Sequence, residues 1–198
     1  MPELPEVETV RLGLQRLLSR KRVSAVQFDT PKSFPNAPAD VDAFLIDATI
    51  LQARRRAKVL MIDLSTEYSL VIHLKMTGQL VFRGSETFGA GHPNDSLIGE
   101  LPDKSTRVTI TFDDDSHLYF NDQRKFGWMR LMPTIEVPNI DFMKKVGPEP
   151  LSKEFTADVF VERVLRRKNT SIKAAILDQT VLAGVGNIYA DESLFAAK

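Results

Sequence analysis

The chain has 198 residues, enough for one large domain or two small ones, and its 43% hydrophobic content is ordinary for a globular protein that buries a core. Its 26 basic and 26 acidic residues give a formal net charge of +0, which argues mildly against a nucleic-acid partner unless the cations are clustered. The absence of cysteine excludes disulfides and cysteine-ligated zinc within this chain, and no apolar run reaches membrane-spanning length.

The three histidines, His73, His92 and His117, are too scattered to propose a metal site. The N-terminal segment is acidic and contains prolines, which is the wrong character for a signal peptide. We therefore expect a cytoplasmic protein.

The first ten residues, MPELPEVETV, contain a candidate nucleophile. Removal of Met1 from before a residue as small as Pro2 is routine processing, and it would leave a free secondary amine. Such an amine has a pKa near 8, so a useful fraction is unprotonated at pH 7. Its condensation with an aldehyde gives an iminium that is positively charged at any pH and can act as an electron sink.

A helix is predicted to follow directly. Pro5 suits its first turn, and apolar residues recur at the spacing of one helical face. Glu3 and Glu6 then flank the helix start beside the amine, where one could shuttle protons while the other orients Pro2. They could equally be ordinary acidic residues of a helix N-terminus. The apolar face consists of Val7, Val10, Leu14, Leu17 and Leu18.

β-structure is predicted for most of the next hundred residues. Residues 23–28 alternate with a period of two, and a long β-like run over 49–64 is followed by a second over 68–74. Residues 74–78 are expected to form the turn of a hairpin leading into 79–82, and the Gly-, Ser-, Pro- and Asn-rich segment 84–105 to form a long loop.

A hairpin is predicted further on, from strands 107–112 and 117–121. The polar loop after it contains Arg124, Lys125 and Phe126. A basic pair beside an aromatic ring suits a finger that inserts into a nucleic-acid groove, and it also suits an ordinary loop with a buried Phe.

Two groups of cations are candidates for phosphate binding. The first is Arg54, Arg55, Arg56 and Lys58, with no acid between Asp47 and Asp63, and a solvated edge strand guarded by charge explains it equally well. The second lies between Arg163 and Lys173, again without an acid.

The pattern changes from strands to helices after a proline-containing linker. We expect an N-terminal domain over 1–133, a linker over 134–150 and a helical domain over 151–198. Three helices are predicted: 155–167, 170–178 with Thr170 as N-cap, and 187–197. The glycines before Asn187 would leave backbone N–H groups free as a seat for phosphate.

Taken together, these motifs resemble one family, the formamidopyrimidine-DNA glycosylases, which are bifunctional base-excision repair enzymes. Six matching segments run in the family's order from the first residues to the last helix. They are PELPEVET (2–9), RRAK (55–58), HLKMTG (73–78), DQRKFG (122–127), GPEPL (147–151) and GVGNIYA (184–190).

The resemblance implies an α+β fold, with an N-terminal β-sandwich and flanking helices followed by a partial helix-two-turn-helix domain. It implies that Pro2 attacks the sugar of a flipped oxidised purine with Glu3 as acid–base partner. It places Glu6 and Lys58 in the same active site. The implied partner is double-stranded DNA with oxidised bases, bound by a monomer. Six further positions are implied to contact this DNA: His73, Met76, Arg124, Phe126, Lys173 and Asn187.

Of these, Met76, Arg124 and Phe126 would fill the gap left by the flipped nucleotide, while Lys173 and Asn187 would contact phosphates. The family usually continues with a four-cysteine zinc finger. This sequence stops before one, so we expect a C-terminally truncated chain with no cofactor of its own. The alternatives are an endonuclease VIII-like enzyme for oxidised pyrimidines, a tautomerase using Pro2 as a base, and a DNA-binding remnant without full activity.

Overall fold

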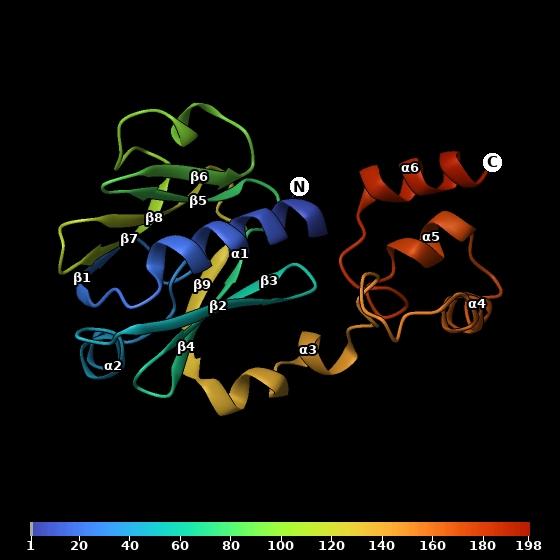
Figure 1. Cartoon of the computed structure of the whole chain (residues 1–198), viewed down its shortest axis with the longest axis horizontal. Helices are drawn as coiled ribbons and strands as arrows, with labels where there is room; N and C mark the ends of the chain where they lie inside the picture. The colour runs from blue at the N-terminus through green and yellow to red at the C-terminus, as the bar shows by residue number, and fades with distance from the viewer. Residues whose placement is uncertain (1) are drawn as a thin grey trace.

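The computed structural model describes residues 2–198 and shows two parts joined by a short connecting segment (Figure 1). The first part contains two antiparallel β-sheets and the second is helical. The N-terminal end of the first helix, α1 (Leu4–Leu18), points toward the helical part. The chain therefore has the α+β architecture expected from its sequence.

One sheet has five strands in the order β1-β7-β8-β5-β6. Its strands are β1 (Val23–Phe28), β5 (Gly78–Arg83), β6 (Thr87–Gly91), β7 (Thr106–Phe112) and β8 (His117–Asp122).

The other sheet has four strands in the order β2-β3-β4-β9. Its strands are β2 (Ile50–Arg56), β3 (Val59–Leu64), β4 (Tyr68–His73) and β9 (Trp128–Pro133). A short helix, α2 (Pro38–Phe44), precedes β2. Every residue of β3 is buried, which explains its continuous apolar sequence in place of an alternating one.

The two sheets share one core, and α1 covers its open side. The buried side chains of the main cluster come from both sheets, among them Leu60 and Ile62 of β3 and Leu80 and Phe120 of the five-stranded sheet. α1 lies against β2 and β6, which are the edge strands of the two sheets. Its predicted apolar face is buried as expected, because only this stripe of the helix faces the sheets.

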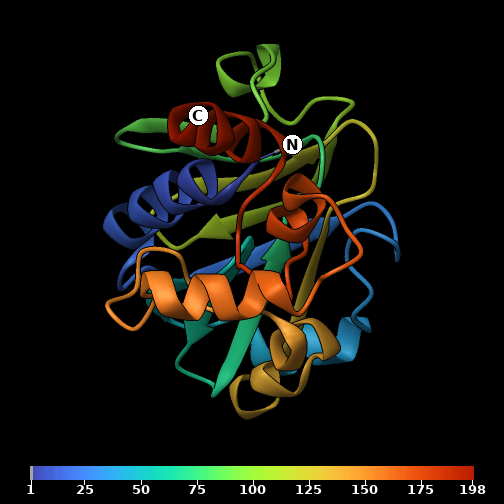
Figure 2. The same cartoon turned by 90° about the vertical axis from the view of Figure 1, so that its right-hand side faces the viewer.

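The connecting segment and the helical part follow β9. The segment contains a 3₁₀-helix, η2 (Thr134–Asn139), and a short α-helix, α3 (Asp141–Lys145). The helical part contains α4 (Ala157–Leu165), α5 (Ile172–Leu177) and α6 (Asn187–Ala197) around a small apolar core of its own. Figure 2 views this part from its own side, with α4 and α6 as separate rods and α5 between them. None of the described helices is long and apolar enough to span a membrane.

The predicted β-run 49–64 is β-structure, divided into two paired strands by a turn at Ala57 and Lys58. Three other local expectations were wrong. Residues 74–78 are no hairpin turn, because β4 and β5 belong to different sheets. The presumed loop 84–105 contains β6 and a 3₁₀-turn, η1 (Asp95–Leu97). The N-cap of α5 is Ser171, whose side chain accepts the N–H of Ala174, and not Thr170.

Candidate active site

The carboxylate of Glu3 joins the start of the chain to the start of α6. Glu3 is 3% exposed, and Pro2 beside it is also buried. Glu3 Oε2 accepts N–H groups from Gly186 at 2.8 Å and Tyr189 at 3.2 Å, while Oε1 accepts that of Ile188 at 2.9 Å. These are the unsatisfied donors of a helix N-terminus, so Glu3 takes the place there that we expected a phosphate to occupy. The expectation of free N–H groups before Asn187 is therefore corrected.

Glu6 lies one helical turn along α1 and links the same two elements. Its Oε2 accepts the backbone N–H of Glu3 at 2.8 Å, and its Oε1 accepts the hydroxyl of Tyr189 at 3.2 Å. The negative charge of Glu6 raises the pKa of Tyr189, which keeps that hydroxyl protonated as a donor. Glu6 thus fixes both the backbone next to Pro2 and the first turn of α6.

Lys58 reaches the helical part from the β2–β3 turn. Only 6% of the residue is exposed, and Nζ donates to the carbonyl oxygen of Val185 at 3.0 Å. Burial lowers the pKa of Lys58, while the negative charges of Glu3 and Glu6 oppose this effect. The structure therefore brings Pro2, Glu3, Glu6 and Lys58 together at one junction, although they come from two elements of the first part.

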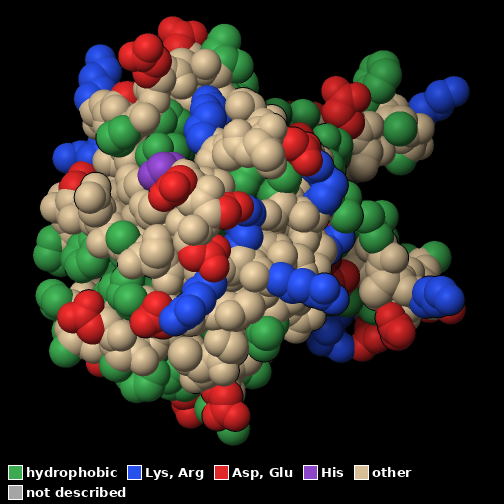
Figure 3. Space-filling view, turned by 60° about the vertical axis from the view of Figure 1, so that its left-hand side comes forward, with side chains coloured by type: hydrophobic (Ala, Val, Ile, Leu, Met, Phe, Trp, Pro, Cys, Tyr) green, Lys and Arg blue, Asp and Glu red, His purple; other side chains and the backbone are tan. Residues whose placement is uncertain are grey.

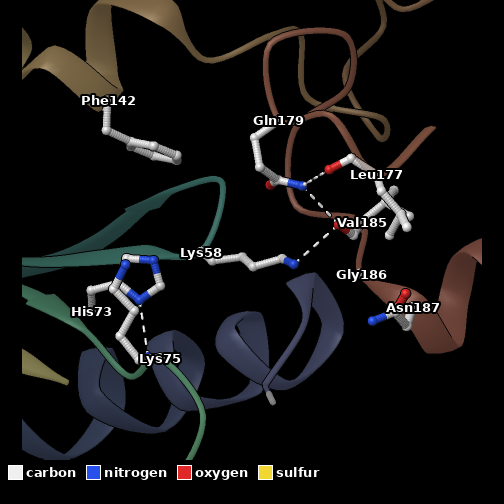
Figure 4. Close-up of a pocket in the computed structure, with 9 residues that line it drawn as sticks. All are labelled: Lys58, His73, Lys75, Phe142, Leu177, Gln179, Val185, Gly186 and Asn187. Carbon is white, nitrogen blue, oxygen red and sulfur yellow. Dashed lines mark hydrogen bonds between the residues drawn. The ribbon is translucent and has the colours of Figure 1, made fainter. Parts of the chain in front are cut away.

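A cavity of about 230 Å³ opens beside this junction (Figure 4). His73 and Lys75 line it from the sandwich, and Phe142 lines it from the connecting segment. The helical part contributes Gln179, whose Nε2 donates to the Val185 carbonyl at 2.8 Å, the acceptor that Lys58 also uses. The remaining lining residues are Lys58, Leu177, Val185, Gly186 and Asn187.

His73 is a neutral donor in this cavity. Burial, together with the positive charges of Lys75 and Lys58, lowers its pKa from 6.5 to about 3. Nδ1 accepts the backbone N–H of Lys75 at 3.0 Å, so the single proton of the neutral ring is on Nε2. A neutral Nε2–H can donate to a phosphate or carbonyl oxygen at any pH near neutrality.

A second group of predicted residues meets at the tips of two loops. Arg124 Nη1 lies 3.4 Å from the sulfur of Met76, and its guanidinium carbon is 5.0 Å from the centre of the Phe126 ring. Met76 is 41% exposed and Phe126 45%, so two apolar side chains stand in solvent with a cation between them. Lys32, which the sequence did not single out, lies over the same ring at 5.5 Å.

The arginines before Lys58 are engaged within the protein. Arg54 pairs with Asp63, while Arg55 donates to Glu8 at 2.7 Å and to Glu149 at 2.8 Å. Burial disfavours the charge of Arg55, but its hydrogen bonds to Glu149 and Glu8 outweigh this and raise its pKa. The second explanation offered for these cations, an edge strand guarded by charge, requires β2 to lie at the edge of its sheet, and β2 does lie there. Among the described residues only Lys58 of the row has no carboxylate within 4.0 Å.

Glu149 is the residue of this region that the sequence analysis left without a role. Its Oε1 accepts the backbone N–H of Ala57 at 2.6 Å and Arg56 Nη1 at 3.0 Å. Ala57 has a φ of 50°, and the N–H that Glu149 holds belongs to the turn that presents Lys58. The segment 147–151 was recognised as a motif, but the role of Glu149 could not be inferred from it, because its hydrogen-bond partners lie about ninety positions earlier in the sequence.

The predicted phosphate contacts of the helical part are less concentrated. Lys173 Nζ pairs with Asp191 at 2.6 Å, Arg166 with Glu162, and Arg167 with Asp178. Asn187 is exposed at the start of α6 and lines the cavity. Figure 3 shows Lys and Arg side chains interspersed with Asp and Glu on one face of the molecule. The 163–173 cations are thus partly compensated by acids outside that segment.

No metal site accompanies these residues. Within 2–198 no group of three or more His, Asp or Glu side chains is placed to hold an ion, and the sequence has no cysteine.

Comparison with known proteins places this geometry in a family. The model of the formamidopyrimidine-DNA glycosylase N-terminal domain matches residues 1–129, and that of the formamidopyrimidine-DNA glycosylase H2TH domain matches residues 146–198. Curated formamidopyrimidine-DNA glycosylases from Herpetosiphon aurantiacus and Rhodopseudomonas palustris are each 42% identical over 200 and 199 residues, respectively. Each alignment covers 100% of this chain and 67% of the relative.

Solved structures agree. The Lactococcus lactis Fpg in complex with DNA containing an abasic site matches with a TM-score of 0.83 and 31% identity, over 98% of this chain and 66% of that one. The complex of the wild-type L. lactis Fpg with DNA containing N7-benzyl-Fapy-dG matches with a TM-score of 0.83 and 32% identity, over 99% and 67%. The chain spans about two thirds of the length of these relatives. Because two family models together match most of the chain and its relatives are well above 30% identical, this protein belongs to the formamidopyrimidine-DNA glycosylase family of DNA repair enzymes.

Proposed function

We propose that this chain removes oxidised purines, such as 8-oxoguanine and formamidopyrimidines, from double-stranded DNA and then cleaves the strand at the abasic site. The observation that carries the proposal is the buried pair Pro2 and Glu3 at the junction, with the Glu3 carboxylate held by three backbone N–H groups of the helical part. The similar L. lactis Fpg structures are complexes with DNA that contains an abasic site or N7-benzyl-Fapy-dG, which supports DNA as the partner.

The chemistry begins at the Pro2 amine. Once Met1 is removed, the amine attacks C1′ of the damaged nucleotide, and the base leaves with a proton. Glu3, adjacent in the chain, is the acid–base partner that moves protons at the sugar. The iminium forms when the sugar ring opens at the C1′–O4′ bond and O4′ receives a proton. Removal of a proton from C2′ then lets the electrons of that bond expel the phosphate on C3′, and removal of a proton from C4′ lets the phosphate on C5′ leave in a second elimination.

The neighbouring residues position the substrate. Lys58 and the Nε2–H of His73 face the cavity beside the junction and suit a phosphate flanking the flipped nucleotide. Met76, Arg124 and Phe126 would fill the space that the nucleotide leaves in the duplex, since apolar side chains stabilise such a gap by stacking.

Borohydride trapping tests this function. Incubation with a duplex containing 8-oxoguanine and borohydride should give a covalent adduct, because borohydride reduces the iminium to a stable amine. A variant extended at the N-terminus, which has no free Pro2 amine, should give none. An equal yield from the extended variant would exclude Pro2 as the nucleophile.

The same assay separates the alternatives. A duplex with an oxidised pyrimidine should be trapped more slowly than the 8-oxoguanine duplex, whereas the reverse order would indicate an endonuclease VIII-like enzyme. Binding to damaged duplex without any adduct would indicate a DNA-binding remnant.

A further inference from the structure

One buried carboxylate connects the two loops whose tips carry Met76, Arg124 and Phe126. Asp122, the last residue of β8, has no exposed surface. Its Oδ1 accepts the hydroxyl of Thr77 and the backbone N–H of Arg124, the latter at 3.2 Å. Its Oδ2 accepts the N–H of Gly127 at 2.6 Å. None of the ion pairs among the described residues involves Asp122, so these hydroxyl and backbone donors are the partners of its carboxyl group.

Thr77 completes the connection from the other loop. It follows Met76 directly and is only 8% exposed. Its hydroxyl oxygen also accepts the N–H of Arg124 at 3.1 Å, so that Thr77, Asp122 and the Arg124 backbone form a closed set of hydrogen bonds. These hydrogen bonds therefore join the loop that carries Met76 to the loop that carries Arg124 and Phe126.

Both loops pass from one sheet to the other. Residues 74–77 lead from β4 of the four-stranded sheet to β5 of the five-stranded sheet, and residues 123–127 lead back from β8 to β9. The pairing of Gly78 with Asp122 sets the two crossings side by side. Lys75 and Lys125 have φ values of 51° and 55°, a left-handed conformation that costs free energy unless the surroundings hold it.

We propose that Asp122 and Thr77 are positioning residues for damage recognition, which hold Met76, Arg124 and Phe126 as one rigid wedge. This inference rests on the proposed function, in which the three side chains replace a flipped nucleotide. A wedge already ordered in the free protein loses little conformational entropy when it enters the stack, so more of its contact energy is left to offset unstacking. Neither residue touches the DNA in this role.

The first test uses the free protein and needs no DNA. Thr77→Val removes the hydroxyl and keeps the shape of the side chain. Amide hydrogen exchange should become faster in residues 122–127, some 45 positions away in sequence. Thr77→Ser keeps the hydroxyl and should restore slow exchange. Thr66→Val, which removes a hydroxyl bonded to the Phe44 carbonyl elsewhere in the sandwich, should leave residues 122–127 unchanged.

The second test measures discrimination, as the ratio of the dissociation constants for an intact duplex and for one with an abasic-site analogue. Thr77→Val and Asp122→Asn should lower this ratio about tenfold, the scale of one hydrogen bond to a charged group. Affinity for intact duplex and its salt dependence should not change, because no cation is lost. Thr77→Ser should again behave as wild type.

The outcomes separate the inference from the function on which it rests. Unchanged exchange in Thr77→Val, or accelerated exchange with wild-type discrimination, would overturn the positioning role. If the wild-type protein binds intact and abasic-analogue duplexes equally well, the proposed function is contradicted. The coupling of the two loops is still tested in that case, because amide hydrogen exchange in residues 122–127 is measured without DNA.

Discussion

Gly186 donates its backbone N–H to Glu3 Oε2 at 2.8 Å, and a Cβ at this glycine would lie 2.5 Å from the Glu3 carboxyl carbon. The junction between the two parts therefore depends on a glycine because a carboxylate occupies the space of its side chain. The same contact fixes the group that we propose as acid–base partner of Pro2. Docking of the helical part against the sandwich therefore also fixes the position of the Glu3 carboxylate beside Pro2.

Gly186→Ala should separate the two parts at this point. The added methyl group must displace a buried carboxylate that is held by three hydrogen bonds. We expect trapping on 8-oxoguanine duplex to slow by about 10²-fold, the cost of misplacing a reacting group by about 1 Å. The measurement is the single-turnover rate of adduct formation. Ile188→Ala, which alters an exposed side chain on the same turn, is the control and should trap at the wild-type rate.

Glu149→Gln should weaken the attachment of the connecting segment to the Lys58 turn. The carboxylate accepts the Ala57 N–H and two arginines, whereas a carboxamide would turn an N–H₂ toward some of these donors. We expect a loss of about 1–3 kcal/mol in the free energy of unfolding, measured by urea denaturation. The exposed pair Arg16 and Glu86 provides the control, and Glu86→Gln should change stability by less than about 1 kcal/mol.

The Glu149 effect should also depend on pH. Burial favours the neutral acid, but hydrogen bonds from Arg55 and Ala57 outweigh this and hold the pKa of Glu149 below 4.5. A carboxyl whose pKa is lowered on folding stabilises the protein fully above its unfolded pKa and loses that contribution as the pH falls through the folded value. The stability difference between wild type and Glu149→Gln should therefore be constant above pH 4.5 and shrink below it. A difference that stays constant down to strong acid would contradict the assignment.

His73 predicts a second pH dependence, in a higher range. Its folded pKa of about 3 lies below the value of 6.5 for a free side chain, so the unfolded chain binds a proton that the folded one does not. The contribution of neutral His73 to the free energy of unfolding is therefore fully present above pH 6.5 and falls progressively below it. We expect a loss of about 2 kcal/mol between pH 7.5 and 5, which His73→Gln should largely abolish. His117→Gln serves as the control, and an NMR titration of His73 near pH 6.5 would refute the prediction.

Lys173 allows a test of the phosphate contacts of the helical part. If it neutralises a phosphate, Lys173→Ala should lower the slope of log affinity against log salt by about one. Its partner in the free protein is Asp191, at 2.6 Å. Asp191→Asn should then strengthen duplex binding, because the lysine no longer has to leave a carboxylate. Equal salt slopes for wild type and Lys173→Ala would show that the 163–173 cations are only a solvated surface.

What the sequence predicted well depends on local patterns. The apolar stripe of α1 and the bounds of α6 follow from residues close together in the chain, and both were confirmed. β9 was missed, and the turn at 74–78 was assigned to a hairpin, because the partners of a strand are chosen by residues far away. The role of Glu149 was missed for the same reason, because its partners lie far away in the sequence, on β2 and the turn after it.

The candidate site shows the limit most clearly. The residue types at Pro2, Glu3 and Lys58 could be singled out from chemistry, but the backbone donors that hold Glu3 carry no signature in their side chains. The sequence indicated that the start of α6 would bind an anion. Only the fold shows that this anion is a carboxylate of the protein itself.

The hydrogen bond from Gly186 to Glu3 spans 183 positions in the sequence, nearly the whole chain. During synthesis the strands of the sandwich leave the ribosome before α6 and can pair while that helix is still being made. Contacts of such separation close a very long loop, and this entropic cost favours their formation after local structure exists. A nascent sandwich therefore carries the proposed nucleophile, Pro2, before the backbone donors of α6 that hold Glu3 have been made.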